Sequence, residues 1–475
     1  MKNRKYIYLK NTFILGLFFV ATVSCEREIS DEAAFATFPN TAEVFTDTPI
    51  GLGSNFYFPY QGSKLTAFSV DTEVSYKGAA SVRIDVPNAN DPEGSYAGAI
   101  FKIDGAGRNL TEYDALTFWA KSSQAAILSE VGFGEDFGAN KYQTTRQNIS
   151  LTTNWVKYII PIPDPSKLVD ERGMFRYAAA GIGVQGSEVG YSFWIDELKF
   201  EKLGTIAQPR PSILKGVDKV EQSFIGSNVT LTDLTQTFNM ATGINQTVTA
   251  APSYFIFKSS NVEVARVSEL GVVSIVGTGT AKITASLGSV AAAGSLTINS
   301  LGSFTAAPAP IHTAGNVISI FSNAYTNQPV EYYNGYWAPY QTTLGQDDIH
   351  INGNDVIKYS VLNFVGIQFT KPTINVSQMT HFHIDIKVTN PIPSGGFLTI
   401  KLQDIGPDNT FGTSDDAAGE IKYTSTTLVA GTWVSIDVPL FSFPGLTKKS
   451  NLAQVVFVSD ATIKDILVDN IYFHK

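Results

Sequence analysis

Aromatic residues gather in two short segments of the chain that hold too much proline and glycine to form core strands. The segments are 56–62 (FYFPYQG) and 335–341 (GYWAPYQ), and both contain Pro-Tyr-Gln. Aromatic faces can stack on pyranose rings, while nearby amides, carboxylates and cations meet the hydroxyl groups. We therefore predict carbohydrate-binding platforms here; the alternative is that each segment only packs against the edge of a domain. The candidate rings are Tyr57, Tyr60, Tyr336, Trp337 and Tyr340.

A second group of candidates lies in two segments that alternate like strands, 116–121 (LTFWAK) and 382–387 (FHIDIK). Side chains of a strand point alternately to opposite faces, so the apolar residues predict one buried face and the others an outer face. If the outer face is concave, it forms a polar binding strip; if it is convex, these are ordinary solvated side chains. The candidates on this face are Trp119, Lys121, His383 and Asp385.

The inventory of nucleophiles and bases argues against an enzyme. All five histidines follow residue 300, and Cys25 is the only cysteine. The first part of the chain therefore has no histidine base, and no free thiol is left if Cys25 is acylated. A glycosidase needs only two positioned carboxylates, which the sequence does not exclude. We predict a protein without catalytic activity.

An internal repeat indicates which elements position these residues. The stretch from about 40 to 203 reappears, diverged, from about 316 to 475. The spacing agrees as well, because Tyr60 to Trp155 is 95 positions and Tyr340 to Trp433 is 93. The matched strings include GAASVRIDV with GNDVIKYSV, YAGAIFKI with FVGIQFTK, TTNWVKYIIPI with AGTWVSIDVPL, and WIDELKF with LVDNIYF.

Short runs of β-branched and aromatic residues, punctuated by turn residues, fill both copies. Since no long stretch has the 3.6-residue apolar spacing of a helix, the chain predicts an all-β fold with two jelly-roll β-sandwiches, at 40–204 and 316–475. Trp155 and Trp433 share one repeat position and Trp194 matches a leucine. We predict that all three tryptophans pack inside the sandwiches.

Residues 213–299, between the two copies, differ from both. The run SSNVEVARVSELGVVSIVGTGTAKITA closely resembles the bacterial Ig-like group 2 family, which implies an Ig-like β-sandwich that acts as a spacer. The flanking segments 206–216 and 301–315 are rich in proline. We predict that they are semi-rigid linkers that hold the two sandwiches apart.

The N-terminus has the pattern of a secretory signal. Four basic residues precede an apolar run that is too short to cross a bilayer. The approach to Cys25 resembles a lipobox, although Thr22 stands where leucine is usual. Residues 1–25 thus predict a lipoprotein signal peptide with lipidation at Cys25. Residues 26–39 are a predicted tether, and its acidic start resembles the signal that exports Bacteroidetes lipoproteins to the outer face of the outer membrane.

The charge balance limits the partners. Removing residues 1–25 changes the formal net charge from −9 to −13, because four basic residues and no acidic ones lie there. Such a chain repels nucleic acid and anionic lipid. We predict no nucleic-acid partner, and membrane contact through the lipid anchor only.

Two sets of motifs carry a resemblance to known surface proteins. FYFPYQGSKLTAFSVDT, VPNANDPEGSYAGAIFK and RGMFRYA resemble the N-terminal module of surface glycan-binding lipoproteins from Bacteroidetes polysaccharide-utilisation loci. ISIFSNAYTN, MTHFHIDI and VDNIYFHK are similar to a module appended to flavobacterial laminarinases. The E-x-D-x-x-E strand of the laminarinase catalytic domain itself is absent from the sequence.

This resemblance implies a cell-surface lipoprotein that binds polysaccharide without cleaving it, with a laminarin-like β-glucan as the favoured ligand. It also implies a neighbouring outer-membrane oligosaccharide transporter and its lipoprotein partner. A surface adhesin and a divergent glycoside hydrolase remain the alternatives.

The resemblance further implies a structural calcium ion, because such jelly-roll modules often hold one between their first and last strands. The implied ligands are Asp47, Asp196 and Asp469, with backbone carbonyls near a turn such as 77–78. Oxygen ligands from distant strands suit this hard cation. Asn323 replaces Asp47 in the second copy, so the site is expected to be weaker or empty there.

Overall fold

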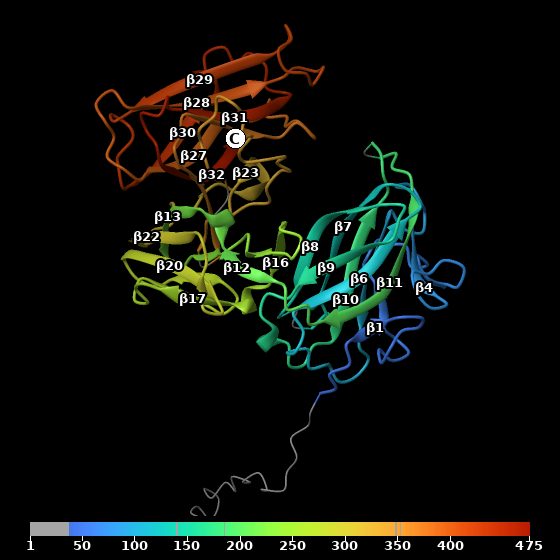
Figure 1. Cartoon of the computed structure of the whole chain (residues 1–475). Helices are drawn as coiled ribbons and strands as arrows, with labels where there is room; N and C mark the ends of the chain where they lie inside the picture. The colour runs from blue at the N-terminus through green and yellow to red at the C-terminus, as the bar shows by residue number, and fades with distance from the viewer. Residues whose placement is uncertain (1–37, 139–140, 185, 347–348, 352) are drawn as a thin grey trace, which may run out of the picture.

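The computed structural model describes residues 38–138, 141–184, 186–346, 349–351 and 353–475 (Figure 1). The predicted signal peptide, Cys25 and most of the tether lie outside these residues. Within the described ranges the fold is all-β, and the only helical elements are 3-10 turns, none of which could span a membrane. The turns are η1 (Pro165–Lys167), η2 (Leu214–Gly216), η3 (Pro252–Tyr254), η4 (Ala314–Asn316) and η5 (Leu440–Ser442).

The first sandwich consists of two antiparallel sheets. One sheet has the strand order β3-β4-β11-β6-β9, with β1 paired to β11. The other begins with the order β2-β5-β10-β7-β8. The strands are β1 (Glu43–Phe45), β2 (Tyr57–Pro59), β3 (Phe68–Asp71), β4 (Ser81–Val86), β5 (Tyr96–Lys102), β6 (Ala115–Ser122), β7 (Ala126–Phe133), β8 (Thr144–Leu151), β9 (Val156–Pro161), β10 (Gly173–Ala180) and β11 (Tyr191–Glu201).

The core lies between the two sheets and follows the period-two alternation of the sequence. In β6, Leu116 and Phe118 are fully buried, whereas Trp119 and Lys121 face away from the core. Aromatic rings from both sheets meet inside, for example Phe118 and Phe175 at 5.9 Å between ring centroids. The predicted all-β sandwich is thus confirmed.

The middle unit is not held apart from the first sandwich. Its strands β16, β15 and β12 continue the sheet beyond β8, because Thr249 pairs with Thr145 (Figure 1). The predicted linker 206–216 is therefore wrong in part, since β12 occupies most of it. One cluster of buried apolar residues runs through both units. The strands are β12 (Ala207–Ser212), β13 (Asp218–Ile225), β14 (Asn228–Thr230), β15 (Thr235–Asn239), β16 (Asn245–Ala250), β17 (Phe255–Ser259), β18 (Ala265–Val267), β19 (Val272–Ile275), β20 (Gly279–Leu287), β21 (Val290–Ala291) and β22 (Ser295–Ser303).

The second sandwich repeats the strand order of the first. One sheet has the order β24-β25-β32-β27-β30, with β23 paired to β32, and the other has the order β26-β31-β28-β29. The last strand of each copy bulges after an aspartate, where Glu197 (φ 47°) and Asn470 (φ 50°) are left-handed. The strands are β23 (Val317–Phe321), β24 (Ile349–Ile351), β25 (Asn354–Tyr359), β26 (Phe364–Gln368), β27 (His381–Val388), β28 (Phe397–Asp404), β29 (Ala417–Thr424), β30 (Trp433–Pro439), β31 (Leu452–Val458) and β32 (Ile466–His474).

The predicted linker 301–315 begins with the end of β22 and then lies along the second sandwich. The indole N–H of Trp433 donates to the carbonyl of Thr305 at 2.6 Å, and the amide of Asn470 donates to the carbonyl of Pro308 at 3.1 Å. We call residues 304–312 the docked segment. It covers the outer face of the sheet that contains β27, β30 and β32.

Candidate functional site

Tyr57 is partly buried and packs against the core, and not on a surface platform. Its ring stacks on Phe68 at 4.8 Å between centroids, and its hydroxyl lies 3.1 Å from that of Tyr177. Burial raises the pKa of the Tyr57 phenol. The surface position predicted for this residue is wrong, because the pleat of β2 turns Tyr57 inward.

Tyr60, in contrast, lies on the outer face of the sheet that contains β5 and β10. Gly98 of β5 lies beneath it: a Cβ atom there would meet the ring of Tyr60 at 2.9 Å and that of Tyr96 at 2.8 Å. The neighbours Ala97 and Ala99 point into the core. The missing side chain of Gly98 thus allows two tyrosine rings to approach the sheet.

A buried cation lies beside Tyr60. Arg176 of β10 is 7% exposed and donates to Glu135 at 2.6 Å and to Glu130 at 2.7 Å. The hydroxyl of Tyr60 donates to Glu135 at 2.5 Å. Burial alone would lower the pKa of Arg176, but the acidic partners and Tyr60 outweigh it and raise the pKa. This face therefore presents fixed charges next to aromatic rings.

The second copy builds a similar platform with a different ring. Trp337 lies across Gly366 of β26, where a Cβ atom would collide with the indole, and is roughly parallel to the ring of Phe364. Gly366 and Gly98 occupy the same repeat position. Trp337 therefore takes the place that Tyr60 has in the first copy, although the sequence repeat pairs it with Tyr57.

The loop that carries Trp337 is held by two amide side chains. Asn334 is 3% exposed and donates to the carbonyl of Gly345 at 2.7 Å. Gln341 accepts the backbone N–H of Trp337 at 3.0 Å. On this loop Tyr336 is 52% and Tyr340 78% exposed. The predicted exposure of these two tyrosines is confirmed, and their binding role stays a prediction.

Amide side chains line the sheet next to Trp337. Gln368, Gln454 and Gln403 are cross-strand neighbours on β26, β31 and β28. The amide of Gln454 donates to Gln368 at 2.8 Å. This row is not apparent from the sequence, because each strand contributes only one of its members.

Trp119 faces outward from the other sheet of the first sandwich, as predicted. Its indole stacks on Tyr76 with 3.9 Å between ring centroids, and Trp155 packs edge-on against the same tyrosine. The core position predicted for Trp155 is wrong, since this tryptophan is only partly buried on the outer face.

Lys121 and Trp194 lie on the same outer face. The ammonium group of Lys121 is 5.7 Å from the ring centroid of Trp194, and the indole N–H donates to Asp71 at 2.9 Å. The core position predicted for Trp194 is therefore wrong as well. In the second copy, Trp433 packs against Phe304 of the docked segment and not inside the sandwich.

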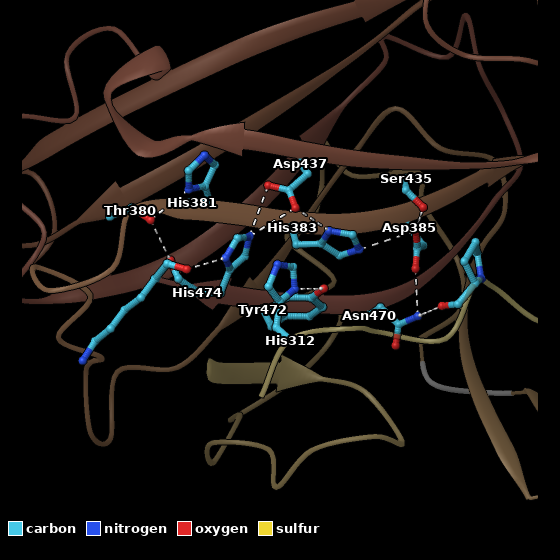
Figure 2. A network of polar contacts seen from close by, with 12 residues as sticks. His312, Thr380, His381, His383, Asp385, Ser435, Asp437, Asn470, Tyr472 and His474 are labelled. Atoms are coloured by element: carbon cyan, nitrogen blue, oxygen red, sulfur yellow. Dashed lines mark hydrogen bonds and ion pairs between the residues drawn. The ribbon is translucent and has the colours of Figure 1, made fainter. Parts of the chain in front are cut away.

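His383 and Asp385 also point away from the core, but the docked segment lies over them (Figure 2). Asp385 is 1% exposed and accepts from Ser435 at 2.5 Å and from Asn470 at 2.8 Å. His383 stacks on Tyr472 at 4.4 Å. Burial alone would lower the pKa of His383, but the nearby carboxylates raise it. In the second copy the predicted strip is thus neither an accessible cleft nor a solvated face.

The carboxylates proposed for calcium hold a turn in the first copy. Asp196 accepts the backbone N–H groups of Tyr76 at 2.8 Å and Lys77 at 3.0 Å, and Asp47 accepts those of Ala79 and Ala80. These N–H groups bond to Oδ2 of Asp196 and to Oδ1 of Asp47, so as arranged the two carboxylates stabilise the turn by hydrogen bonds. Calcium binding stays a prediction.

In the second copy, Asp469 is 2% exposed and accepts the N–H of Asn470 at 2.7 Å. Burial raises the pKa of Asp469 to about 7. Asn323, which stands in the place of Asp47, exchanges two hydrogen bonds with Asp355. Asn323 and Asp469 therefore also accept hydrogen bonds from within the second copy.

Comparison with known proteins identifies the class of the first sandwich. Residues 41–202 match the family model of carbohydrate binding domain 30. The chain is thus a protein that carries a carbohydrate-binding module. The match spans the first sandwich and does not extend to the middle unit or the second sandwich. No curated protein sequence matches the chain significantly.

Solved structures with low similarity belong to the same class. A crystal structure of a family 30 carbohydrate-binding module has 17% identity and a TM-score of 0.25, covering 34% of this chain and 86% of its own. A family 11 module from Clostridium thermocellum, in complex with a β-1,3-1,4-mixed-linked tetrasaccharide, has 16% identity and a TM-score of 0.23, covering 34% and 95%. The N-terminal CBM22-1-CBM22-2 tandem domain from Paenibacillus barcinonensis has 10% identity and a TM-score of 0.22, covering 93% and 99%.

Proposed function

We propose that this chain is a non-catalytic, cell-surface lipoprotein that binds polysaccharide, with a laminarin-like β-glucan as its ligand. The observation that carries the proposal is the pair of aromatic platforms over Gly98 and Gly366. Each copy uses a glycine at the same strand position to lay an aromatic ring across the same outer face. Polar groups lie beside each ring, in the combination that sugar binding demands.

The choice between the two outer faces of each sandwich follows from the docked segment. In the second copy this segment covers the face that contains His383 and Asp385, so that face cannot accept a polymer. The opposite face carries Trp337 and, at its edge, the exposed Tyr336 and Tyr340. We therefore place the shared binding function on the faces of Tyr60 and Trp337.

Two binding faces on one chain favour a long polymer over a short oligosaccharide. Once one face has bound, the second meets the same polymer at a high effective concentration, which raises the apparent affinity without new contacts. The lipid anchor proposed at Cys25 would hold this arm at the outer face of the outer membrane. There it would pass captured glucan to an oligosaccharide transporter and its lipoprotein partner.

Affinity electrophoresis tests the proposal. The chain from residue 26 onward, which keeps every described residue, is run through gels containing β-glucans, xylans or α-glucans. We expect retardation by laminarin-like β-glucan, reduced in Trp337→Ala and in Tyr60→Ala. Trp194→Ala, on the opposite outer face of the first copy, is the matched control and should be retarded like the unmodified protein.

The alternatives give different results. A surface adhesin would show no retardation in any of these gels, and a glycoside hydrolase would release reducing ends from the glucan. If Trp194→Ala loses retardation while Tyr60→Ala keeps it, the binding face has been assigned to the wrong sheet of the first copy.

A further inference from the structure

Four of the five histidines meet on the outer face of the second sandwich (Figure 2). His381 and His383 come from β27, His474 from β32, and His312 from the docked segment. The ring of His474 lies between those of His312, at 3.7 Å, and His381, at 5.0 Å. Of these four residues only His383 was predicted as a site residue, since His312 lies more than 60 residues from the others in the chain.

One carboxylate faces this group. Asp437 of β30 places its two oxygens 3.1 and 3.2 Å from Nε2 of His474, and one of them lies 3.3 Å from Nδ1 of His383. One ligand atom each from His312, Asp437 and His474 lies within 4.8 Å of the other two. In the described part of the chain, this is the only group of three such residues at that spacing.

The hydrogen bonds of His474 leave an unusual arrangement. Its Nδ1 lies 3.1 Å from the carbonyl oxygen of Lys475, which can only accept, so Nδ1 carries the hydrogen. In the neutral ring Nε2 then carries a lone pair and faces a carboxylate, which is also an acceptor. A proton on Nε2 makes this contact an ion pair, and a metal ion between the two atoms would bond to both.

We propose that His312, Asp437 and His474 bind a zinc ion that fastens the docked segment to the second sandwich. Imidazole and carboxylate ligands suit zinc. The stacked rings of His312 and His474 must turn so that both lone pairs meet at the ion, and the ligand spacing of up to 4.8 Å must close to about 3.3 Å, which follows from the bond lengths of a tetrahedral site. Tyr472 supports the site, since its hydroxyl is 3.0 Å from Nδ1 of His312 and leaves Nε2 for the metal. His383 holds Asp437 from the other side.

The metal would stiffen the connection between the middle unit and the second sandwich. His312 is the one ligand on the connecting segment, whereas Asp437 and His474 belong to the sheet. Without the ion, the segment is held by hydrogen bonds such as that of Trp433 to Thr305. Phe224 of the middle unit also shares a buried apolar cluster with Ile351 and Leu467 of the second sandwich, and the metal would add a further link to this connection.

Isothermal titration of ZnCl2 into metal-free protein, as the chain from residue 26 onward, tests the site. We expect one ion per chain, and an affinity that falls at least about tenfold in His312→Ala and in Asp437→Asn, by analogy with the loss of supporting groups at zinc sites. His350→Ala is the matched control, because His350 is exposed and pairs with Asp355 away from the cluster. CaCl2 should not compete, since calcium prefers oxygen ligands.

Limited proteolysis gives a second readout that does not depend on affinity. Zinc should slow cleavage within residues 304–312 in the unmodified protein and in His350→Ala, but not in His312→Ala, whose substitution lies outside any strand and leaves the sheet intact. Equal zinc affinity in His312→Ala and the unmodified protein, or no protection of the segment, would overturn the proposal.

Discussion

The two sandwiches share a strand order but present different chemistry on the face that each leaves open. In the first copy the residue row through β5, β10 and β7 is Ile100, Arg176 and Gly132, and the arginine is held by two glutamates. In the second copy the same row holds the three glutamines Gln368, Gln454 and Gln403. One scaffold thus carries a charged surface in one copy and a neutral amide surface in the other.

What the copies keep in common is the glycine beneath the ring. The ring itself changes, from Tyr60 to Trp337, and reaches the glycine from a different position of the repeat. Both copies therefore keep a space above the sheet for an aromatic ring, but they do not keep the same aromatic residue. The two faces are consequently expected to favour different stretches or substituents of one polysaccharide.

The largest contrast between the copies is expected in stability. Arg176→Met leaves Glu130 and Glu135, which are both only partly buried, without their cation. It should destabilise the first sandwich by about 2 kcal/mol, because hydrogen bonds of a charged group are lost. Gln454→Met, in the second copy, loses an amide hydrogen bond and should cost about 1 kcal/mol. Amide hydrogen exchange in β5 and β10 measures the loss of stability in the first copy, and exchange in β26 and β31 measures it in the second. Equal losses of stability in Arg176→Met and Gln454→Met would contradict the distinction between a charged residue row in the first copy and a neutral one in the second.

The glycines give a contrast in binding. Gly366→Ala forces Trp337 away from the sheet, and all the nearest contacts of the new methyl group are with that movable ring. We expect the fold to persist and glucan affinity to fall about tenfold, close to the effect of losing one aromatic contact.

Gly98→Ala is the counterpart in the first copy. Its methyl group would also lie 3.2 Å from the backbone oxygen of Tyr177, which cannot move as freely as a side chain. We therefore expect a loss of stability together with a loss of binding. Circular dichroism melting beside affinity electrophoresis separates the two effects; if Gly366→Ala melts as early as Gly98→Ala, the second platform is not a movable ring.

A pH series compares the buried carboxyls of the two copies. Burial raises the pKa of Glu171 in the first copy to about 7, as it does for Asp469 in the second. Between pH 4.5 and 7 the folded Glu171 keeps a proton that the unfolded chain has lost. The free energy of unfolding of the first sandwich therefore falls as pH rises through this window, by up to about 3 kcal/mol.

Glu171→Gln should remove this pH response from the first copy alone. One oxygen of Glu171 accepts the N–H groups of both Arg172 and Gly173, and a glutamine can keep both bonds. Hydrogen exchange at pH 5 and pH 7.5 provides the measurement. A first sandwich whose protection still declines toward pH 7.5 in this variant would show that another group titrates.

The smallest expected effect concerns the docked segment of the second copy. Trp433→Phe removes the hydrogen bond to Thr305 and should weaken docking by about 1 kcal/mol, seen as faster proteolysis of residues 304–312. Trp155→Phe changes the equivalent repeat position of the first copy and should leave that proteolysis unchanged. Equally fast proteolysis of the docked segment in Trp433→Phe and in Trp155→Phe would contradict a specific role of the hydrogen bond from Trp433.

Alternation and the repeat were sufficient to predict the sandwiches. Leu116 and Phe118 alternate with Trp119 along β6. Both copies show the same alternation, so each supports the strand assignment of the other. The same alternation could have placed Trp194 outside, because its neighbours Phe193 and Ile195 are buried. The match with a leucine outweighed it and led to the wrong prediction.

The site was predicted less well, for reasons that lie in long-range packing. The segment that carries Tyr57 contains a strand of only three residues, too short for alternation to show which ring points inward. The burial of Asp385 depends on the docked segment, which comes from more than 70 residues away in the chain. The sequence around Asp385 therefore contains no pattern that would predict its burial by the docked segment.

The pairing of β16 with β8 has a consequence for how the chain unfolds. Because one sheet crosses from the first sandwich into the middle unit and one apolar cluster fills both, neither can melt without exposing part of the other. Calorimetry should therefore record two cooperative transitions and not three: a larger one for residues 43–303 and a smaller one for 317–475. A pulling force on the first sandwich would accordingly act on a continuous sheet. We expect the smaller contact between the middle unit and the second sandwich, around Phe224 and residue 304, to separate first.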